Sequence, residues 1–128
     1  MKQLLTLFLV FNSVVSFSQD VYYAKKIEYL NGKLISNTQG NYKISFGVGS
    51  LNRKQQPYFT IYHNNIEQTW LAFTEHRGYL KKDSEILSED LYFDTKSSQG
   101  AMVLSSPNKD KMVIFYNNNK RVEYYKYL

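Results

Sequence analysis

The chain of 128 residues contains no cysteine. That absence excludes disulfide bridges, Cys-ligated zinc, iron–sulfur clusters, thiol catalysis and a lipid-modified N-terminal cysteine. Only two histidines, His63 and His76, are available as imidazole bases or metal ligands. Zinc takes three or four ligands, so this pair would need Glu67, Glu75 or Asp83 to complete a site. We therefore expect no metal and no cofactor.

Sequence motifs of familiar catalytic chemistry are also missing. The chain has no G-x-S-x-G, no H-E-x-x-H and no glycine-rich phosphate loop, because Gly47-Val48-Gly49 lacks the third glycine and the helix that should follow it. No catalytic residue is assigned. We predict a protein that is not an enzyme.

Long hydrophobic runs are confined to the N-terminus, where residues 1–18 have the order of an export signal. Lys2 supplies a positive start, residues 4–15 are mostly apolar, and small residues stand three and one before a cut ahead of Gln19. The apolar stretch is shorter than the roughly 20 residues that span a membrane, although an uncleaved anchor or a buried strand is the alternative. We predict an exported protein, periplasmic or extracellular, with no transmembrane span.

Charge of either sign is modest. The formal net charge is +5, and removal of Lys2 with the signal leaves +4. A balance this small does not predict a nucleic-acid partner. Basic pairs stand at predicted strand ends and turns, where lysines commonly block edge-to-edge pairing of sheets.

Aromatic residues, in contrast, are abundant, with twelve Tyr, eight Phe and one Trp. Such residues favour strands. Asn31-Gly32 between two strand-like segments predicts a tight hairpin, and Asn64-Asn65 offers a second two-residue turn. Strand-like segments recur every ten to twelve residues. The spacing predicts that residues 19–128 form a single all-β domain, a small antiparallel barrel or sandwich of about eight strands.

Several local features divide this pattern into strands. Polar residues over 37–41 predict a loop, residues 49–57 predict the longest polar connection, and Gly78 predicts a break. In the segment 58–63 both faces carry large side chains, and we take Phe59 and Ile61 as core.

The segment 64–76 has two interpretations. Asn65 and Gln68 satisfy the capping-box spacing of a helix start, whereas Trp70 and its neighbours Thr69 and Phe73 prefer strands. We favour the strand.

An exported chain with about eight short antiparallel strands resembles the small lipocalin-like barrels of the calycin group. The resemblance is one of architecture, and it implies an up-and-down barrel. The lipocalin G-x-W near the first strand is absent, since this chain has Asn31-Gly32-Lys33-Leu34 there and its single Trp70 stands mid-chain. No site residue is therefore carried over from that group.

Tyrosine is the most informative residue type for function. Adjacent pairs such as Tyr22-Tyr23 and Tyr124-Tyr125 must show one ring on each face of a strand, so some aromatic surface should remain outside the core. Exposed aromatic rings beside basic residues suit a protein, a sugar ring or an amphipathic ligand. The strand aromatics with polar neighbours are our candidate ligand-binding residues: Tyr58, Tyr62, Trp70, Tyr116, Tyr125 and Tyr127.

These observations favour an exported, non-enzymatic binding module. It would hold a small apolar or amphipathic ligand in the barrel mouth, or present an aromatic face to an extracytoplasmic protein or glycan. One alternative is a small hydrolase or metal-dependent enzyme that uses His63 or His76 with a nearby carboxylate. Another is a structural or inhibitory interaction protein without a cavity. The sequence leaves the oligomeric state open.

Overall fold

A computed structural model describes residues 19–51 and 53–128, which form eight antiparallel strands. Apolar and polar residues alternate along these strands, as expected of a sheet with one buried face. Each strand pairs with the next, and β8 pairs with β1 to close a barrel. The strands are β1 (Gln19–Leu30), β2 (Lys33–Leu51), β3 (Lys54–His63), β4 (Ile66–Lys82), β5 (Glu85–Asp94), β6 (Gln99–Ser105), β7 (Lys111–Tyr116) and β8 (Lys120–Tyr125). The predicted all-β barrel is confirmed. The predicted signal, residues 1–18, lies outside the described residues.

Two-residue turns fix the register of three hairpins. Asn31-Gly32, Asn64-Asn65 and Asp83-Ser84 join β1 to β2, β3 to β4 and β4 to β5, and both residues of each turn have positive φ. Positive φ at both positions is the requirement of type I′ turns, whose twist matches that of the strands they join. The first two turns were predicted, and the structure confirms them together with the preference for a strand after Asn65.

β2 is longer than the sequence predicts, with 19 residues. The predicted loop at 37–41 is wrong, because Asn37, Thr38 and Gln39 pair with β1. The predicted connection over 49–57 is also wrong, because residues 49–51 pair with residues 54–56 in the β2–β3 ladder, with Gly49 opposite Gln56. Polar residues are tolerated in these strands because their backbone groups form the hydrogen bonds of the ladder while their side chains stay in contact with solvent.

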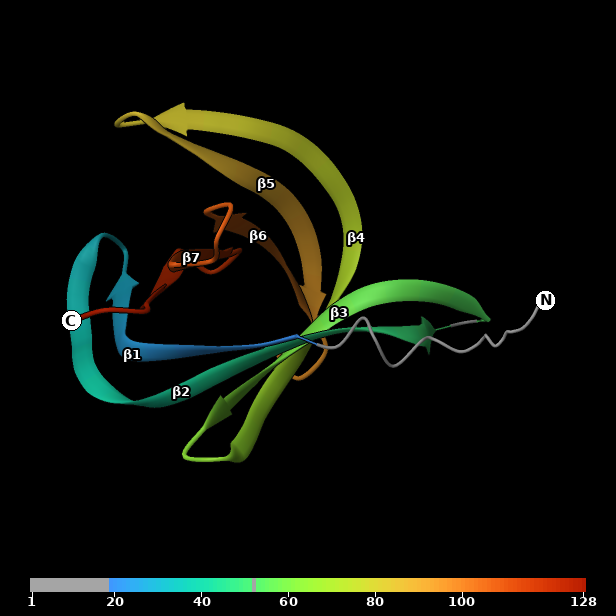
Figure 1. Cartoon of the computed structure of the whole chain (residues 1–128), viewed down its shortest axis with the longest axis horizontal. Helices are drawn as coiled ribbons and strands as arrows, with labels where there is room; N and C mark the ends of the chain where they lie inside the picture. The colour runs from blue at the N-terminus through green and yellow to red at the C-terminus, as the bar shows by residue number, and fades with distance from the viewer. Residues whose placement is uncertain (1–18, 52) are drawn as a thin grey trace.

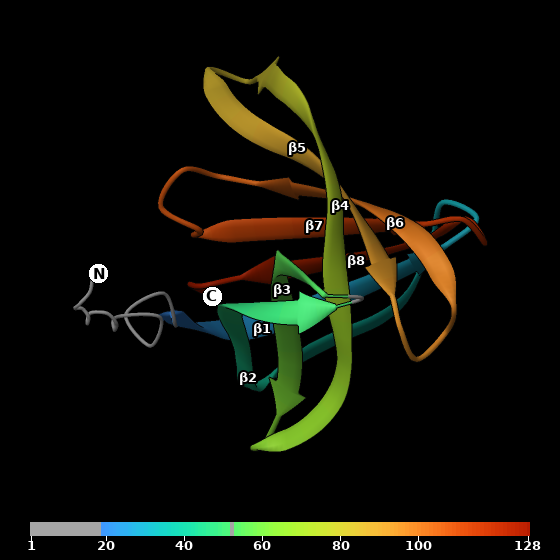
Figure 2. The ribbon, with the colours of Figure 1, turned by 90° about the vertical axis from the view of Figure 1, so that its right-hand side faces the viewer.

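Gly78 does not end a strand, contrary to prediction, and β4 continues to Lys82. The residue has φ of 138° and lies at one of two bulges in the β4–β5 ladder, between Phe73 and Glu75 and between His76 and Gly78. Bulges add an unpaired residue and bend a strand. β4 accordingly follows a wide arc (Figure 1). It crosses the direction of β6, β7 and β8 (Figure 2).

The barrel has two different ends. The upper end carries the turn Asp83-Ser84 and the β6–β7 loop, residues 106–110, whereas the lower end carries the β5–β6 turn, residues 95–98. The β3–β4 ladder covers only the lower part, from Tyr58 opposite Ala72 downward. Above it β3 stays with β2 and β4 stays with β5, so the two hairpins diverge and the upper end is open (Figure 1).

Side chains fill the middle of the barrel. Phe59 and Ile61, predicted as core, are buried there, and Phe59 packs edge-on against Tyr92 with 4.7 Å between ring centres. The largest fully buried side chains are Phe59, Ile44, Leu71, Met112, Ile114 and Val103. Replacing a buried Phe by Ala typically lowers the free energy of unfolding by about 3–5 kcal/mol, so these side chains contribute strongly to the stability of the barrel. No channel therefore runs through the barrel along its described strands.

Asp94 closes the lower end. Its carboxylate accepts hydrogen bonds from the Thr69 hydroxyl (2.7 Å), the Lys96 and Ser97 amides (3.0 and 3.1 Å) and the Tyr116 hydroxyl (3.0 Å). Burial opposes ionisation of Asp94, but these four donors outweigh it and lower the pKa of the carboxyl. Asp94 therefore joins β4, β5, the β5–β6 turn and β7.

The adjacent tyrosine pairs behave as expected of strands. Tyr23 and Tyr124 are buried with ring centres 5.8 Å apart, whereas Tyr22 is 59% exposed and Tyr125 is half-buried on the outside. Some aromatic surface therefore does remain outside the core. In the described part of the chain, no helix is long and apolar enough to cross a membrane.

Candidate functional site

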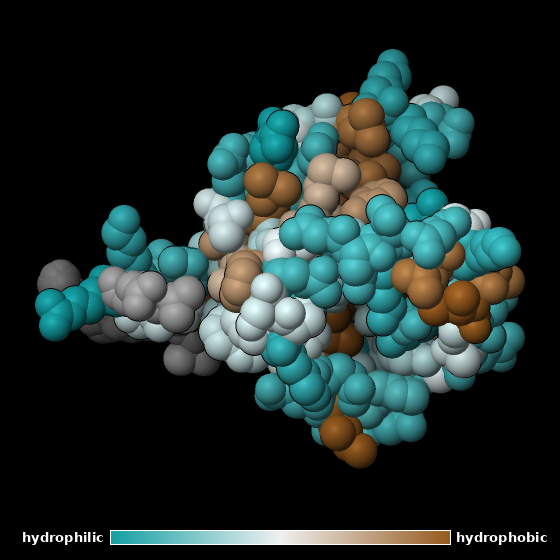
Figure 3. All heavy atoms as spheres, turned by 180° about the vertical axis from the view of Figure 1, so that it is seen from behind, coloured by the Kyte–Doolittle hydropathy of each residue, from teal (hydrophilic) through white to brown (hydrophobic). Residues whose placement is uncertain are grey.

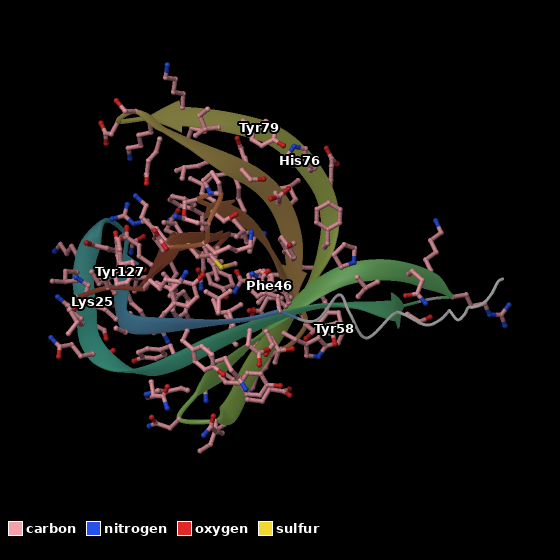
Figure 4. The ribbon with its side chains drawn as sticks, viewed as in Figure 1. Lys25, Phe46, Tyr58, His76, Tyr79 and Tyr127 are labelled. Carbon is pink, nitrogen blue, oxygen red and sulfur yellow. The ribbon has the colours of Figure 1, made fainter. Side chains whose placement is uncertain are left out.

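The six aromatic residues predicted to bind ligand do not form one site. Tyr58, Tyr62 and Trp70 come together on the outer face of β3 and β4. Tyr127 follows β8 and is 70% exposed, on the opposite side of the molecule from Tyr58 (Figure 4). The six are thus divided among an outer groove, the lower end and the β8 side.

Tyr116 and Tyr125 have partners within the fold. The Tyr116 hydroxyl donates to Asp94, and its ring packs against the core. The Tyr125 hydroxyl donates to Glu123 at 2.7 Å, and Lys25 Nζ lies 5.1 Å from the centre of the Tyr125 ring. Burial, followed by the nearby carboxylates, raises the pKa of both phenols. The Tyr116 hydroxyl thus joins β7 to β5, whereas the Tyr125 hydroxyl bonds within β8.

A cavity of about 340 Å³ lies at the upper end of the barrel, and we call it the mouth cavity. Its floor is the filled core, and its walls come from β2, β4, β5, β6, β7 and the β6–β7 loop. The lining is apolar on one part, with Phe46, Ile86, Tyr92, Val103, Pro107 and Met112, and polar on the other, with Tyr79, Ser88, Asp90, Ser105, Ser106 and Lys109. Mixed lining of this kind is typical of small-molecule sites, which often occupy barrel mouths.

The second β4 bulge places His76 and Tyr79 on the same face of the strand, and Tyr79 lines this cavity. His76 faces Asp90 and Tyr79 faces Ser88, although residues three apart on a regular strand point to opposite faces. The extra residue at the bulge shifts the alternation by one position, so both side chains lie on the same face of β4. Their rings meet edge-on with centres 5.1 Å apart, and they lie side by side on the β4 arc (Figure 4).

The β6–β7 loop brings a lysine to the cavity. Lys109 has φ of 62°, its amide donates to the Ser106 carbonyl at 3.0 Å, and the Ser106 amide donates to the Lys111 carbonyl at 3.2 Å. This tight turn places Lys109 Nζ 5.3 Å from the centre of the Phe46 ring on β2. A cation over an aromatic ring is a favourable arrangement, worth about 0.5–1 kcal/mol at an accessible site.

The charged side chains of the mouth cavity, Asp90 and Lys109, differ in whether they have partners within the fold. Asp90 accepts from Ser88 Oγ at 2.8 Å, and one of its oxygens lies 2.6 Å from His76 Nδ1. None of the ion pairs between described residues involves Lys109. Burial first, and Asp90 second, raise the pKa of Tyr92 to about 12, so this phenol is neutral at physiological pH. Lys109 is therefore a cation of the cavity that forms no ion pair with any described residue.

The two histidines have separate surroundings. His63 stacks on Tyr42 with 4.5 Å between ring centres and 13° between planes, as a packing residue. His76 is paired with Asp90 at the rim of the mouth cavity. Across residues 19–51 and 53–128, no group of three His, Asp or Glu side chains is arranged to hold a metal ion.

Sequence reasoning missed the mouth cavity residues. Phe46, Tyr79 and Lys109 stand on three separate segments, and only the barrel closure and the β4 bulges bring them together. A local signal existed in Ser106 to Lys109, whose spacing is that of the S-x-x-K motif. That motif places a serine nucleophile beside a lysine. Here the Ser106 hydroxyl bonds within its own loop and Lys109 lies over Phe46, so the two do not form a catalytic pair.

Comparisons of the chain with protein-family models, with curated proteins and with solved structures give no match. Function must therefore be argued from the geometry of the barrel.

Proposed function

We propose that this protein is an exported binding module that holds a small amphipathic anion in the mouth cavity. The observation that carries the proposal is the position of Lys109, which has no ion-pair partner among the described residues and lies over the apolar Phe46 ring at the mouth cavity. A carboxylate head group bound to Lys109 would leave its hydrocarbon body against Phe46, Ile86 and Met112. The chemical class is a carboxylate with a short aliphatic or aromatic body.

The size of the cavity limits the ligand. About 340 Å³ is near the lower end of the range for small-molecule sites, and the filled core below prevents a long chain from entering the barrel. Polar groups on the opposite wall, Ser88 and Ser105 among them, favour a ligand that is not wholly apolar. A medium-chain fatty acid such as decanoate fits this description.

Decanoate titrated into the protein and followed by calorimetry tests the proposal. We expect saturable binding that weakens about tenfold to a hundredfold in Lys109→Gln, since a hydrogen bond to a charged group contributes about 1.5–3 kcal/mol. Lys33→Gln is the matched control, because Lys33 is exposed beside the β1–β2 turn at the lower end. Absence of decanoate binding, or equal affinities of Lys109→Gln and wild type, would overturn the proposal.

The His76–Asp90 pair favours one second candidate, hydrolysis with His76 as general base. Nδ1 of the imidazole lies 2.6 Å from Asp90, which leaves Nε2 on the other edge of a ring whose side chain is 43% exposed. A carboxylate that orients an imidazole in this way is a common feature of general-base sites. Hydrolysis of p-nitrophenyl esters that is lost in His76→Ala and kept in His63→Ala would support this candidate. Equal rates in both variants and wild type would remove it.

A further inference from the structure

We infer that the outer face of β3 and β4 carries a second site, which binds a neutral glycan chain. We call it the aromatic groove, and it is formed by Tyr58, Tyr62 and Trp70 with Ser50, Gln56, Pro57, Thr60, Glu67 and Ala72. Its volume is about 440 Å³. It lies on the opposite face of the barrel wall from the mouth cavity. Phe46 pairs with the buried Phe59 and shares its inward face, whereas Tyr58, next to Phe59 on β3, points outward.

The aromatic rings of the groove are held in place. Tyr58 and Trp70 meet edge-on, with 6.1 Å between ring centres and 80° between planes. Beneath them Thr60 is only 7% exposed, although it points to the outside of the barrel, because the rings cover it. The Trp70 carbonyl also accepts bonds from the Thr95 amide and hydroxyl, at 3.1 and 2.9 Å. A fixed ring loses little entropy when a ligand stacks on it.

Two glycines on β2 make room for Tyr58. A Cβ atom at Gly47 would lie 3.3 Å from the Tyr58 ring, and one at Gly49 would lie 3.1 Å from it. Both distances are tighter than ordinary van der Waals contact. The nearest ring atoms are Cε1 and Cδ1 at Gly49 and Cζ and Cε1 at Gly47, so one edge of the Tyr58 ring lies against the β2 backbone. Glycine at these positions is explained by the position of the ring, because neither residue has a positive φ.

The chemistry of the groove matches a sugar better than a charged ligand. The C–H face of a pyranose packs on the electron-rich face of an aromatic ring, and its hydroxyls need donors and acceptors at the rim. Gln56, Glu67 and Ser50 supply such groups. Glu67 is the only carboxylate of the lining, and Lys43 Nζ lies 4.5 Å from the centre of the Tyr62 ring, so the two signs of charge are balanced.

The shape of the surface favours a chain over a single sugar. A neighbouring groove of about 750 Å³ shares Gln56, Pro57, Trp70 and Ala72 with the aromatic groove and continues past Trp70 to Phe73 and Phe93. Together they follow the line along which β3 and β4 separate. The face seen in Figure 3 shows only separate hydrophobic patches among hydrophilic residues.

Trp70 is the only tryptophan of the chain, so its fluorescence reports directly on the groove. We would titrate wild-type protein with cellohexaose, xylohexaose, chitohexaose, laminarihexaose and maltohexaose. We expect a saturable change in Trp70 emission with at least one of them and a loss of affinity of tenfold or more in Tyr58→Ala. Tyr22→Ala is the matched control, because Tyr22 is an exposed strand tyrosine on β1.

Gly49→Ala provides a second variant that keeps every side chain of the groove. The added methyl displaces the Tyr58 ring, so we expect weaker glycan binding with decanoate binding unchanged. Lys109→Gln should do the reverse, which separates this site from the mouth cavity. No emission change with any of the five hexasaccharides would overturn the inference. So would equal glycan affinities of Tyr58→Ala, Tyr22→Ala and wild type.

Discussion

Two aspartates of β5, Asp90 and Asp94, differ in how completely the fold satisfies them. They are four residues apart on one strand, so both point to the same face, one toward each end of the barrel. Asp94 accepts four hydrogen bonds from three different parts of the chain. Among the described residues, Asp90 has two hydrogen-bond partners, Ser88 and His76, both on the β4–β5 hairpin at the mouth cavity.

The difference between the two aspartates indicates that the two ends of the barrel have different roles. At the lower end, polar side chains hydrogen-bond to one another and connect neighbouring strands. At the upper end, the strands diverge, and Lys109 remains without a carboxylate partner among the described residues. We therefore expect changes at Asp94 to affect folding and changes around Asp90 to affect binding.

The largest expected effect is that of Asp94→Ala. Removing the carboxylate leaves the Thr69 and Tyr116 hydroxyls without their partner, and we expect the free energy of unfolding to fall by about 2–4 kcal/mol. Asp90→Ala, which breaks a partly exposed pair with His76, should lower it by about 1 kcal/mol or less. Urea denaturation of both variants measures this difference. Equal losses of unfolding free energy in the two variants would contradict the proposed difference between the two ends of the barrel.

The pH dependence of stability sharpens the same comparison. Hydrogen bonds lower the pKa of Asp94 from its usual 3.8, so its contribution is complete above that value and is lost as the pH falls through the lowered pKa. The pKa of Glu28 is lowered too. Its burial opposes the shift, but Lys26 and Lys120 outweigh that effect, so the contribution of Glu28 to stability is also lost as the pH falls through its lowered pKa. Wild type should lose more stability than Asp94→Asn between pH 5 and pH 3, as monitored by urea unfolding. Parallel profiles would show that Asp94 contributes nothing.

A smaller effect is expected from single hydroxyls. Tyr116→Phe removes one donor to Asp94 and should lower the free energy of unfolding by about 1.5–3 kcal/mol, the usual contribution of a bond to a charged group. Tyr79→Phe at the upper end is the control, and its effect should stay within about 0.5 kcal/mol because Tyr79 is exposed. Thermal unfolding followed by circular dichroism distinguishes them. A Tyr79 variant as unstable as the Tyr116 variant would go against this account.

The parts of the fold that follow local rules could be predicted from the sequence. Asn31-Gly32 and Asn64-Asn65 form turns because both residues of each pair tolerate positive φ. Phe59 and Ile61 are core because strand alternation carries them inward together. These signals need no knowledge of the rest of the chain.

Features that depend on distant partners could not be predicted in this way. The polar residues 37–41 read as a loop, and only pairing with β1 makes them part of a strand. Gly78 read as a break, and only the bulge opposite Asp90 and Glu89 lets β4 continue past it. Tyr116 was chosen as a candidate for ligand binding from its strand position and polar neighbours. No local signal showed that its hydroxyl would bond to Asp94, which stands 22 residues away. Three rings of the aromatic groove, Tyr58, Tyr62 and Trp70, were chosen as candidates from their strand positions, and their role in binding stays a prediction.

The central claim, that the upper end binds while the lower end holds the fold, is tested most directly by an amide NMR titration of the wild-type protein with decanoate. We predict shifts for Phe46, Ser88, Asp90 and Lys109, which surround the mouth cavity. The amides of Thr69, Asp94 and Tyr116 should stay in place. Shifts that centre on Asp94, or no shifts at saturating decanoate, would contradict the claim.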